Sequence, residues 1–396
     1  MKVALMSSGL LPVPPRKGGA VELYVLKLCE ALRRLGVEAY VIDRLWENMN
    51  ENNYIVRVKV PTLVDSRTFT SILGRSRHLV LKEVVFGIYA SKVLREFDII
   101  HANTAWVGYT LIHMIRKLNA RFVYTCHNPL WPEENVHFGE RLVRLIESYA
   151  MKKANAVIAL NETMRRALVE KGGVNQDKIF VVPNGVDVEF FKPGLRCNEV
   201  NAKYGLEGKR VVLFVGRVTR EKGVHVLLEA VRILRDKHGL RDIKAVVVGP
   251  LSGSFGDDTL TDYARVLREY VIKNNIDAVF TGSLDIEELR YFYSCSHVLV
   301  LPSYFEAFPM VLIEAMASGL PVIGSKTGGI VDIVENGVNG YLFEKGSANE
   351  LAEKLHLVLS DESLRRKLSI NSRAIAESKY SWNTIASRLL KIYSSL

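Results

Sequence analysis

Two glutamates, Glu306 and Glu314, stand eight positions apart where a strand is predicted to give way to a helix. The short apolar run Val298–Leu301 before them is typical of a buried parallel strand. A helix is predicted over 309–318, because proline suits a first helical turn and Gly319 suits the helix end. We therefore expect Glu306 on the loop at the carboxyl end of a strand and Glu314 about one turn inside the helix. Ligands of open α/β sheets bind at this edge, where a helix start offers N–H groups to an anion.

Two cations, Arg217 and Lys222, lie five positions apart in a loop that follows the apolar run Arg210–Val215 and precedes a predicted helix. Cations at a strand end can hold a diphosphate through charge-assisted hydrogen bonds of roughly 1.5–3 kcal/mol each. They can also stabilise the negative charge that grows on a departing nucleotide diphosphate. An ordinary charged surface loop is the alternative interpretation.

Weaker candidates come from the first half of the chain. Gly18 and Gly19 precede a predicted helix, and glycines there let the backbone approach a phosphate closely, although the spacing is neither Gly-x-Gly-x-x-Gly nor a Walker motif. His127 follows a predicted strand, but a lone histidine is more often a packed residue than a catalyst. Asn184 belongs to a Pro-Asn-Gly turn that backbone preference alone explains.

The elements that must position these residues alternate between strands and helices, which predicts parallel sheets. Strands are predicted at 2–6, 38–43, 99–102, 121–126, 156–160, 179–182, 210–215, 244–248, 278–281 and 298–301. Helices are predicted at 20–35, 224–238, 286–294 and 381–393, the last with Trp382, Ile385, Leu389 and Ile392 on one face. A fresh α/β pattern begins after the breakers Pro193 and Gly194, so we expect two domains. The loop 252–256 is predicted to be a flexible insertion.

These motifs resemble those of glycosyltransferase family 4, the retaining glycosyl transferases group 1. The spacing of Glu306 and Glu314 is similar to the family's Glu-x7-Glu motif, and the Arg217 to Lys222 loop is similar to its Gly-Arg…Glu-Lys-Gly element. The resemblance covers most of the chain. It implies an α/β GT-B fold, in which two Rossmann-like domains face each other across a cleft. The implied domains are an acceptor-side domain over 1–190, a donor-side domain over 191–380, and a C-terminal helix over 381–396 that crosses back to the first domain.

The resemblance also implies a reaction and residue roles. A sugar would move from a nucleotide diphosphate sugar to a glycan, lipid-linked or small-molecule acceptor, with retention at the anomeric carbon. Arg217 and Lys222 would hold the diphosphate, Glu314 the ribose and Glu306 the sugar, with His127 beside it. Further donor contacts are expected from Gly18, Gly19, Asn184, Phe308, Met310 and Val311.

Two positions depart from the family's pattern. Ala307 and Pro309 stand where relatives commonly have glycine, and backbone N–H groups of this loop usually hold the donor sugar. Proline has no N–H, so one such hydrogen bond is absent here. The identity of the donor sugar therefore does not carry over from relatives.

Composition limits the remaining possibilities. The chain has 396 residues, 48% of them hydrophobic and 24% charged, which is typical of a globular protein of two domains. No apolar run approaches the ~18 residues that span a bilayer, and the first residues do not resemble a secretory signal. The four cysteines are scattered, which predicts neither a zinc site nor a disulfide framework and favours a reducing cytoplasm. We expect no metal and no cofactor besides the nucleotide sugar.

The net charge of +10 is uneven along the chain. Residues 1–190 hold 26 lysines and arginines against 19 acids, which gives +7. Such a domain favours an anionic partner, either a phosphate-bearing substrate or a membrane surface, although a solvated basic surface explains the charge equally well. The segment 67–95 could form a basic amphipathic helix on anionic lipid, or a core-facing helix with a wet basic side. We expect no nucleic-acid partner, because no helix-turn-helix, zinc-finger or RNA-recognition pattern is present.

Two other functions remain compatible with this sequence. A sugar-nucleotide epimerase could share the fold and the diphosphate site, although the spacing of the cations and glutamates speaks against it. A non-catalytic subunit could bind a nucleotide sugar with the same residues. Product formation without an acceptor would identify an epimerase, and absence of turnover would identify a binding subunit.

Overall fold

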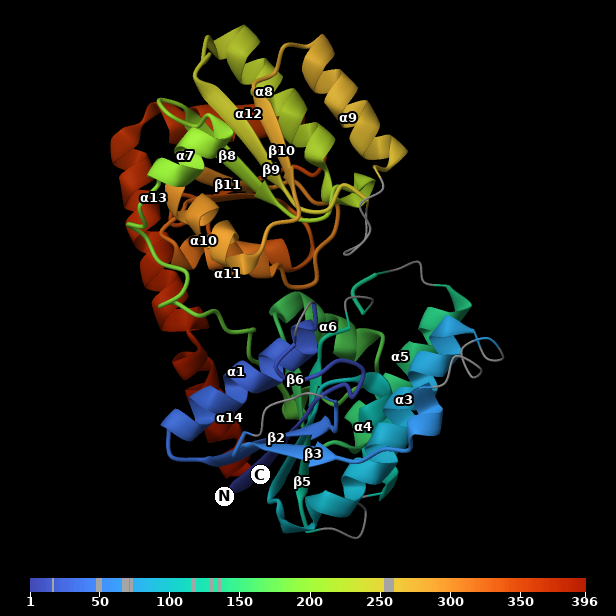
Figure 1. Ribbon diagram of the computed structural model, residues 1–396. Helices are drawn as coiled ribbons and strands as arrows, with labels where there is room; N and C mark the ends of the chain where they lie inside the picture. The colour runs from blue at the N-terminus through green and yellow to red at the C-terminus, as the bar shows by residue number, and fades with distance from the viewer. Residues whose placement is uncertain are drawn as a thin grey trace. The chain divides into compact units, whose positions relative to one another are not determined.

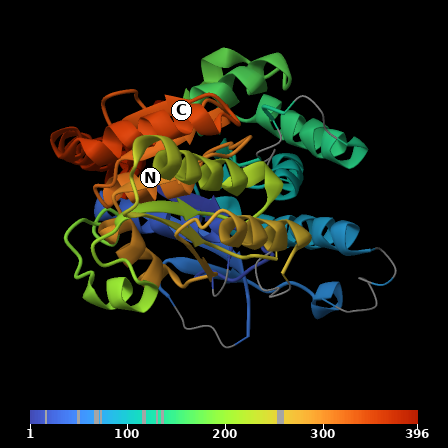
Figure 2. The ribbon, with the colours of Figure 1, turned by 90° about the horizontal axis from the view of Figure 1, so that it is seen from above.

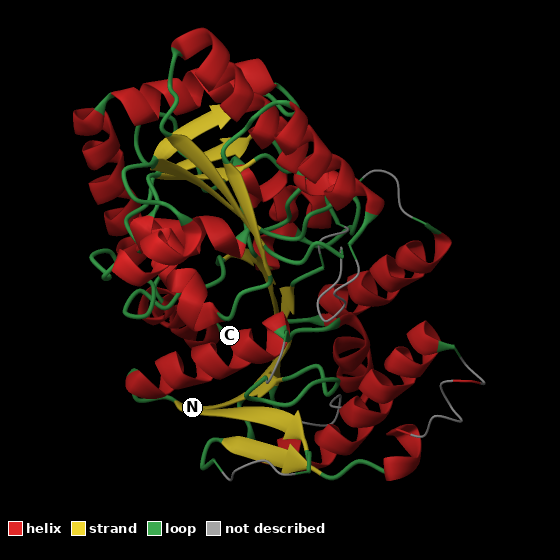
Figure 3. Cartoon of the chain, turned by 45° about the horizontal axis from the view of Figure 1, so that its top comes forward, coloured by secondary structure: helices red, strands yellow, loops and turns green. Residues whose placement is uncertain are grey.

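The computed structural model describes residues 1–15, 18–47, 52–65, 71, 74–114, 119–128, 131–133, 137–252 and 260–396. The chain forms two compact units (Figure 1). Unit 1 comprises Met1–Gly185 and the C-terminal Trp382–Leu396, and unit 2 comprises Val186–Ser381. Each unit has a parallel sheet with helices on its two faces (Figure 3), as the alternating sequence pattern predicts.

Unit 1 is built on a seven-stranded sheet in the order β3-β2-β1-β4-β5-β6-β7. All of its strand pairs are parallel. The strands are β1 (Lys2–Met6), β2 (Glu38–Arg44), β3 (Ile55–Val58), β4 (Ile99–Ala102), β5 (Arg121–Cys126), β6 (Ala156–Ala159) and β7 (Ile179–Val181). The helices are α1 (Ala20–Arg34), α3 (Arg75–Ala90), α4 (Ala105–Met114), α5 (Phe138–Lys153), α6 (Glu162–Glu170) and α14 (Trp382–Ser395). Short 3-10 turns are η1 (Thr62–Asp65), η2 (Ser91–Glu96) and η4 (Gln176–Lys178).

Successive residues of the strands of unit 1 serve opposite faces of the sheet, because side chains alternate along a strand. Val123 belongs to the core cluster formed with α1 and α14. The next residue, Tyr124, lies against α4, where a Cβ added to Gly108 would come within 2.6 Å of the Tyr124 ring. The sheet is therefore buried on both faces, which explains why its strands are continuous apolar runs.

The C-terminal helix α14 packs against α1 within unit 1. The predicted apolar face is buried, and the Trp382 ring lies 5.7 Å from that of Tyr24 in an edge-to-face contact. Further along α14, Tyr393 Oη lies 2.6 Å from Nδ1 of the buried His101, whose Nε2 lies 2.6 Å from Oγ1 of Thr125. Burial lowers the pKa of His101 to about 3, so this histidine is neutral at physiological pH.

Unit 2 has a six-stranded parallel sheet in the order β10-β9-β8-β11-β12-β13. Helices α8 and α9 lie side by side in unit 2 (Figure 2). The strands are β8 (Arg210–Val215), β9 (Ile243–Val248), β10 (Ala278–Gly282), β11 (Val298–Leu301), β12 (Val322–Ser325) and β13 (Gly340–Phe343). The helices are α7 (Asn198–Tyr204), α8 (Val224–His238), α9 (Asp262–Lys273), α10 (Ile286–Cys295), α11 (Met310–Ala317), α12 (Ala348–Ser360) and α13 (Glu362–Ile375). Short turns are η5 (Arg220–Lys222), η6 (Gly328–Ile330) and the π-helical η7 (Ala376–Tyr380).

A disulfide corrects one expectation from the sequence. Cys197, just before α7, is bonded to Cys295 at the end of α10, across 98 residues of chain. The scattered cysteines suggested no disulfide framework, because spacing along the chain does not reveal that the start of α7 lies beside the end of α10. Cys29 and Cys126 are free and buried.

The basic segment 67–95 is helical from Arg75, while residues 66–70, 72 and 73 lie outside the described part of the chain. Two of its basic side chains face the protein. His78 is buried with its Nε2 2.5 Å from the Val64 carbonyl oxygen, and Lys82 forms an ion pair of 3.1 Å with Asp65. These contacts favour a core-facing helix, and membrane contact stays a prediction. Within the described residues, no helix is both long and apolar enough to span a bilayer.

Candidate functional site

The strongest candidate residues lie at the carboxyl ends of β8 and β11, which are paired neighbours in the sheet of unit 2. Arg217 and Lys222 follow β8, and Glu306 follows β11. Parallel strands end at one edge of a sheet, so the pairing brings two loops 84 residues apart into contact. The structure places these residues on strand-end loops, as predicted.

A close approach of backbone to backbone shapes the loop after β8. Gly223 has φ of +69°, and a Cβ added there would lie 2.1 Å from the carbonyl oxygen of Pro302, at the end of β11. Only glycine fits such a position without displacing one of the two loops. Tyr304 N–H also donates to the carbonyl oxygen of Glu221 at 2.8 Å. The loops after β8 and β11 are therefore one packed structure.

Lys222 and Glu306 meet directly in this structure. Nζ of Lys222 lies 2.6 Å from Oε1 of Glu306, and the two side chains are 18% and 13% exposed. Ser303 Oγ donates to the same carboxylate oxygen at 2.7 Å. This partly buried ion pair places a cation and a carboxylate side by side at the edge of the sheet. The ammonium has three N–H donors, so it can hold Glu306 and a phosphate oxygen together.

Backbone contacts hold the Glu306 loop from its other side. Gly329 N–H donates to the Glu306 carbonyl oxygen at 2.7 Å, and a Cβ on Gly328 would lie 2.0 Å from that oxygen. Thr327 Oγ1 donates to the carbonyl oxygen of Tyr304 at 3.0 Å. Glu306 is therefore presented by a loop that β12 and its following turn keep in place.

Arg217 is the exposed cation of the pair predicted to bind phosphate. Its side chain is 43% exposed, and Nη2 lies 3.8 Å from Oε1 of Glu221. Arg217 and Lys222 lie on the same short loop, but Lys222 is half-buried and fixed while Arg217 reaches toward solvent. A cation in this setting can move to a ligand at little electrostatic cost, because a surface ion pair contributes at most about 1 kcal/mol.

Glu314 lies inside α11 and makes a different contact. Tyr293 Oη, from α10, donates to its Oε2 at 2.7 Å. Burial raises the pKa of the Glu314 carboxyl, and the Tyr293 hydrogen bond acts in the opposite direction. The structure places Glu314 one helical turn beyond the Glu306 loop, as predicted, although its polar partner is Tyr293 and not one of the predicted site residues.

The remaining predicted donor contacts of unit 2 surround the start of α11. Pro309 is the residue before the helix, so Met310 and Val311 occupy its first turn and their N–H groups belong to the helix start. Phe308 is half-buried with its ring 6.4 Å from that of Tyr380. These positions fit a site for an anion or a polar sugar, and their role as donor contacts stays a prediction.

Gly18 and Gly19 precede α1 in unit 1. Both have positive φ, at 66° and 81°, and a Cβ on Gly19 would lie 2.9 Å from Cβ of Pro15. Glu22, in the first turn of the helix, is buried and accepts a hydrogen bond from Ser8 Oγ. This carboxylate already complements the positive end of the helix dipole. The phosphate contact of the two glycines stays a prediction.

His127 lies at the carboxyl end of β5 in unit 1. Its ring makes an edge contact with Tyr24 at 4.7 Å, and its Nε2 lies 3.3 Å from Oδ1 of Asn103. The Asn103 amide nitrogen donates to the carbonyl oxygen of Met6, which turns Oδ1 toward the histidine and assigns the proton to Nε2. Burial lowers the pKa of His127 to about 4. His127 is thus a neutral imidazole and a weak base at pH 7.

A buried carboxylate, Glu147, positions the loop that follows His127. It accepts hydrogen bonds from Tyr124 Oη at 2.7 Å, Asn128 Nδ2 at 2.9 Å and Trp131 Nε1 at 2.6 Å. Residues 129 and 130 of this loop lie outside the described part of the chain. Glu147 could not be identified from the sequence, because nothing in the sequence of α5 indicates that this side chain contacts β5.

Asn184 ends the turn after β7. Its Oδ1 is buried and has no hydrogen-bond partner among the described residues. An unpaired buried acceptor costs free energy unless a ligand or water supplies a donor. Asn184 therefore remains a candidate ligand contact.

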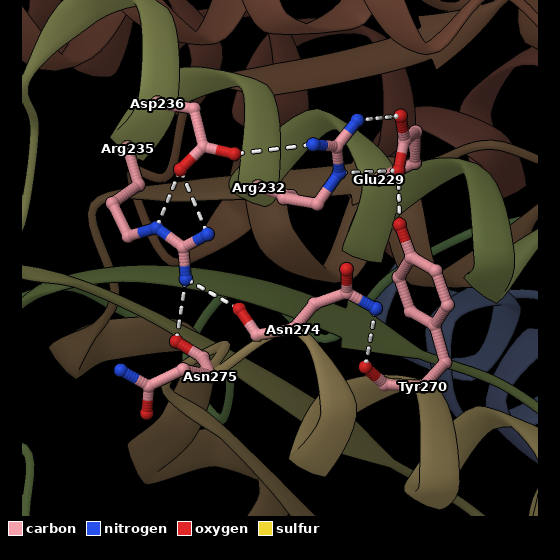
Figure 4. A network of polar contacts seen from close by, with 7 residues as sticks. All are labelled: Glu229, Arg232, Arg235, Asp236, Tyr270, Asn274 and Asn275. Carbon is pink, nitrogen blue, oxygen red and sulfur yellow. Dashed lines mark hydrogen bonds and ion pairs between the residues drawn. The ribbon is translucent and has the colours of Figure 1, made fainter.

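A second edge of unit 2 also has a cavity, but two of the arginines that line it already have hydrogen-bond partners. A cavity of about 780 Å³ lies near the amino ends of β8 and β9 and is lined by Arg232 and Arg235 among others. Figure 4 shows that these cations are already engaged: Arg232 with Glu229 and Asp236, and Arg235 with Asp236 and two backbone carbonyls. This network joins α8 to the end of α9, so we interpret it as structural.

Unit 1 has a cavity of about 960 Å³ beyond the carboxyl ends of β1, β2 and β3. Trp46 and Arg44 line it, with the Arg44 guanidinium 5.1 Å from the centre of the Trp46 ring. Arg44 also donates to Asp65 Oδ1 at 2.9 Å. An aromatic wall beside paired charges can accept a polar ring, and the sequence had no signal for it because the three lining segments come from separate loops.

Comparison with known proteins identifies relatives over the whole chain. Residues 18–190 match the family described as Glycosyltransferase Family 4, and residues 198–375 match the family described as Glycosyl transferases group 1. Spore coat protein SA of Bacillus subtilis strain 168 is 28% identical over 405 residues, which is 99% of each chain. A D-inositol 3-phosphate glycosyltransferase of Corynebacterium aurimucosum is 28% identical over 414 residues, covering 100% of this chain and 96% of the relative.

Solved structures support the fold. The Anabaena protein HepE (Alr3699) in complex with UDP is similar over 100% of both chains, with a TM-score of 0.75 and 21% identity. Its complex with UDP-glucose has a TM-score of 0.72 at 23% identity, again over both whole chains. A likeness at this level of identity concerns the fold, and it confirms the predicted GT-B class of two Rossmann-like domains.

Proposed function

We propose that this chain, which belongs to the family 4, group 1 glycosyltransferases, moves a sugar from a nucleotide diphosphate donor to an acceptor with retention at the anomeric carbon. The observation that carries this proposal is the Lys222–Glu306 pair, 2.6 Å apart at the shared edge of β8 and β11. A cation for a diphosphate and a carboxylate for an electron-poor carbon are the two charges that such a transfer needs. The HepE complexes with UDP and UDP-glucose support a nucleotide sugar as the donor class.

Each charged residue then has a role in the transfer. Lys222 and Arg217 bind the donor diphosphate and take up the negative charge that develops as the bond from the anomeric carbon to phosphate oxygen breaks. In this proposal the Glu306 carboxylate stabilises the positive charge growing on that carbon. The departing phosphate oxygen accepts the proton of the acceptor hydroxyl, so no separate general base is required. Glu314 accepts hydrogen bonds from the ribose hydroxyls.

His127 takes a hydrogen-bonding role in this proposal. With its pKa lowered to about 4 by burial, it is too weak a base to remove a proton at pH 7. Its neutral ring, held by Asn103, can still orient a sugar hydroxyl. We also expect the reaction to need no metal and no further cofactor.

We place the acceptor in the cavity of unit 1 beyond β1, β2 and β3. Trp46 offers an apolar face, and Arg44 and Asp65 offer polar groups to hydroxyls. The chemistry suits a hydroxyl-rich acceptor, whether a free sugar, a glycan end or a lipid-linked sugar.

The test combines donor binding with turnover. UDP-, GDP- and ADP-glucose are compared by thermal shift, and the donor that stabilises the protein is then offered with a panel of sugar acceptors. Lys222→Ala removes up to two charge-assisted hydrogen bonds of roughly 1.5–3 kcal/mol each, so kcat/KM should fall about 10²- to 10⁴-fold. Lys209→Ala is the matched control, because Lys209 pairs with Asp277 near the amino edge of the same sheet.

The outcomes separate the alternatives. Full activity of Lys222→Ala would contradict the assigned site, and conversion of the donor without any acceptor would identify an epimerase. The anomeric configuration of the product, read by NMR, decides retention. Inversion would refute the proposed stereochemistry while leaving the donor site intact.

A further inference from the structure

We propose that Tyr293 is a positioning residue, which holds Glu314 in the orientation that accepts the ribose hydroxyls of the donor. Through Glu314 it sets a preference of the site for ribonucleotides over 2′-deoxyribonucleotides. The inference rests on the proposed function, and in particular on Glu314 as the ribose contact.

The contact between the two residues is direct, and it starts from a buried tyrosine. Tyr293 is fully buried, and its hydroxyl donates to Glu314 Oε2 at 2.7 Å. A glutamate side chain has three rotatable bonds, and a ligand must otherwise select one conformation of the carboxylate. A hydrogen bond to one oxygen fixes the carboxylate plane and leaves Oε1 and a second lone pair of Oε2 for the two ribose hydroxyls.

Tyr293 is itself held by the chain segment that precedes α7. The Phe191 ring packs edge-on against it, with ring centres 5.7 Å apart. The next residue of α10, Ser294, accepts a hydrogen bond from Leu195 N–H at 3.1 Å. The residue after that, Cys295, carries the disulfide to Cys197. Three successive residues at the end of α10 therefore contact one segment, which holds this end of the helix in place.

Phenylalanine would fill the space of the Tyr293 ring, so the hydroxyl itself is not needed for packing. A buried hydroxyl is costly unless it is hydrogen-bonded, and the Tyr293 hydroxyl donates to Glu314. Phenylalanine at this position would keep the ring contact with Phe191 and remove only the bond to Glu314. The role of the bond can therefore be tested without disturbing the core.

The experiment measures dissociation constants by calorimetry for UDP, GDP and ADP and for the 2′-deoxy form of the one that binds. Tyr293→Phe is compared with Tyr291→Phe, a matched control two residues earlier on α10 whose ring packs on the Arg290 guanidinium. Glu314→Gln and the double variant complete a cycle. We expect Tyr293→Phe to weaken ribonucleotide binding about tenfold and 2′-deoxynucleotide binding less than threefold, because one fixed carboxylate contact is lost.

A positioning role also predicts that Tyr293→Phe leaves nucleotide affinity unchanged when Glu314→Gln is already present. In the otherwise unchanged protein, Tyr293→Phe should raise KM for the donor far more than it lowers kcat. An unchanged preference for the ribonucleotide in Tyr293→Phe overturns the inference, as does an equal loss in Tyr291→Phe. If Glu314→Gln abolishes the preference while Tyr293→Phe keeps it, the proposed function stands and the positioning role fails. Absence of binding by all three nucleotides overturns both.

Discussion

Loss of the Cys197–Cys295 disulfide should lower the stability of unit 2 substantially. The bond closes a segment of 98 residues, from the start of α7 to the end of α10. Cross-linking a loop of that length removes chain entropy from the unfolded state worth about 4.7 kcal/mol at 25 °C. For a unit of this size each kcal/mol corresponds to a shift of about 2–4 °C in Tm. The expected fall in Tm is therefore roughly 9–19 °C for the variant Cys197→Ser/Cys295→Ser.

The assay compares thermal unfolding of the aerobically isolated protein and the double variant, each with and without dithiothreitol. The reductant should lower the Tm of the parent protein toward that of the variant and leave the variant unchanged. Alkylation of unfolded, unreduced protein followed by mass spectrometry supplies the control, because only the two free thiols, Cys29 and Cys126, should react.

Reaction of all four thiols before reduction would show that the bond does not form and would refute the predicted stabilisation. Equal unfolding temperatures of the parent and the variant under oxidising conditions would refute it as well. A small difference with the bond intact would mean that the unfolded chain already keeps these two helices close.

Two further predictions concern backbone fit and pH. Gly223→Ala should abolish donor binding and lower stability by about 1–3 kcal/mol, because the added Cβ would lie 2.1 Å from the Pro302 oxygen at positive φ. Gly239→Ala is the control, with φ of +68° and nothing within 4 Å, and equal thermal shifts in both variants would argue against the close approach. The free energy of unfolding should fall on acidification, because burial lowers the pKa of His101 to about 3 and the unfolded chain takes up this proton below pH 6.5. The variant His101→Gln removes this contribution. In chemical denaturation, the free energy of unfolding of the parent protein minus that of the variant should drop by about 2 kcal/mol from pH 6.5 to 5. Parallel pH profiles of the two proteins would contradict the assignment.

Much of the secondary structure follows from local pattern. The strands predicted at 99–102, 121–126, 210–215 and 298–301 match the observed ones, because short apolar runs between breakers are a local property. Three strands were missed: β3, β12 and β13. None of them is a continuous apolar run: β3 contains an arginine, β12 ends in Gly-Ser, and β13 begins with a glycine. The helix pattern was clearest in α14, where the predicted face is the one buried against α1.

The sequence by itself determined which residue types end the strands of unit 2. Lys222 and Glu306 follow β8 and β11 because each loop is bounded by its own apolar run. That they form one ion pair was decided only by the tertiary structure, whose sheet order places β11 beside β8. The same holds for the bond of Tyr293 to Glu314 and for the disulfide, which join helices that are separate in the sequence. Local composition sets the period and the ends of an element, but neighbours across a sheet are chosen by the packing of the whole unit, and no short window of sequence contains that information.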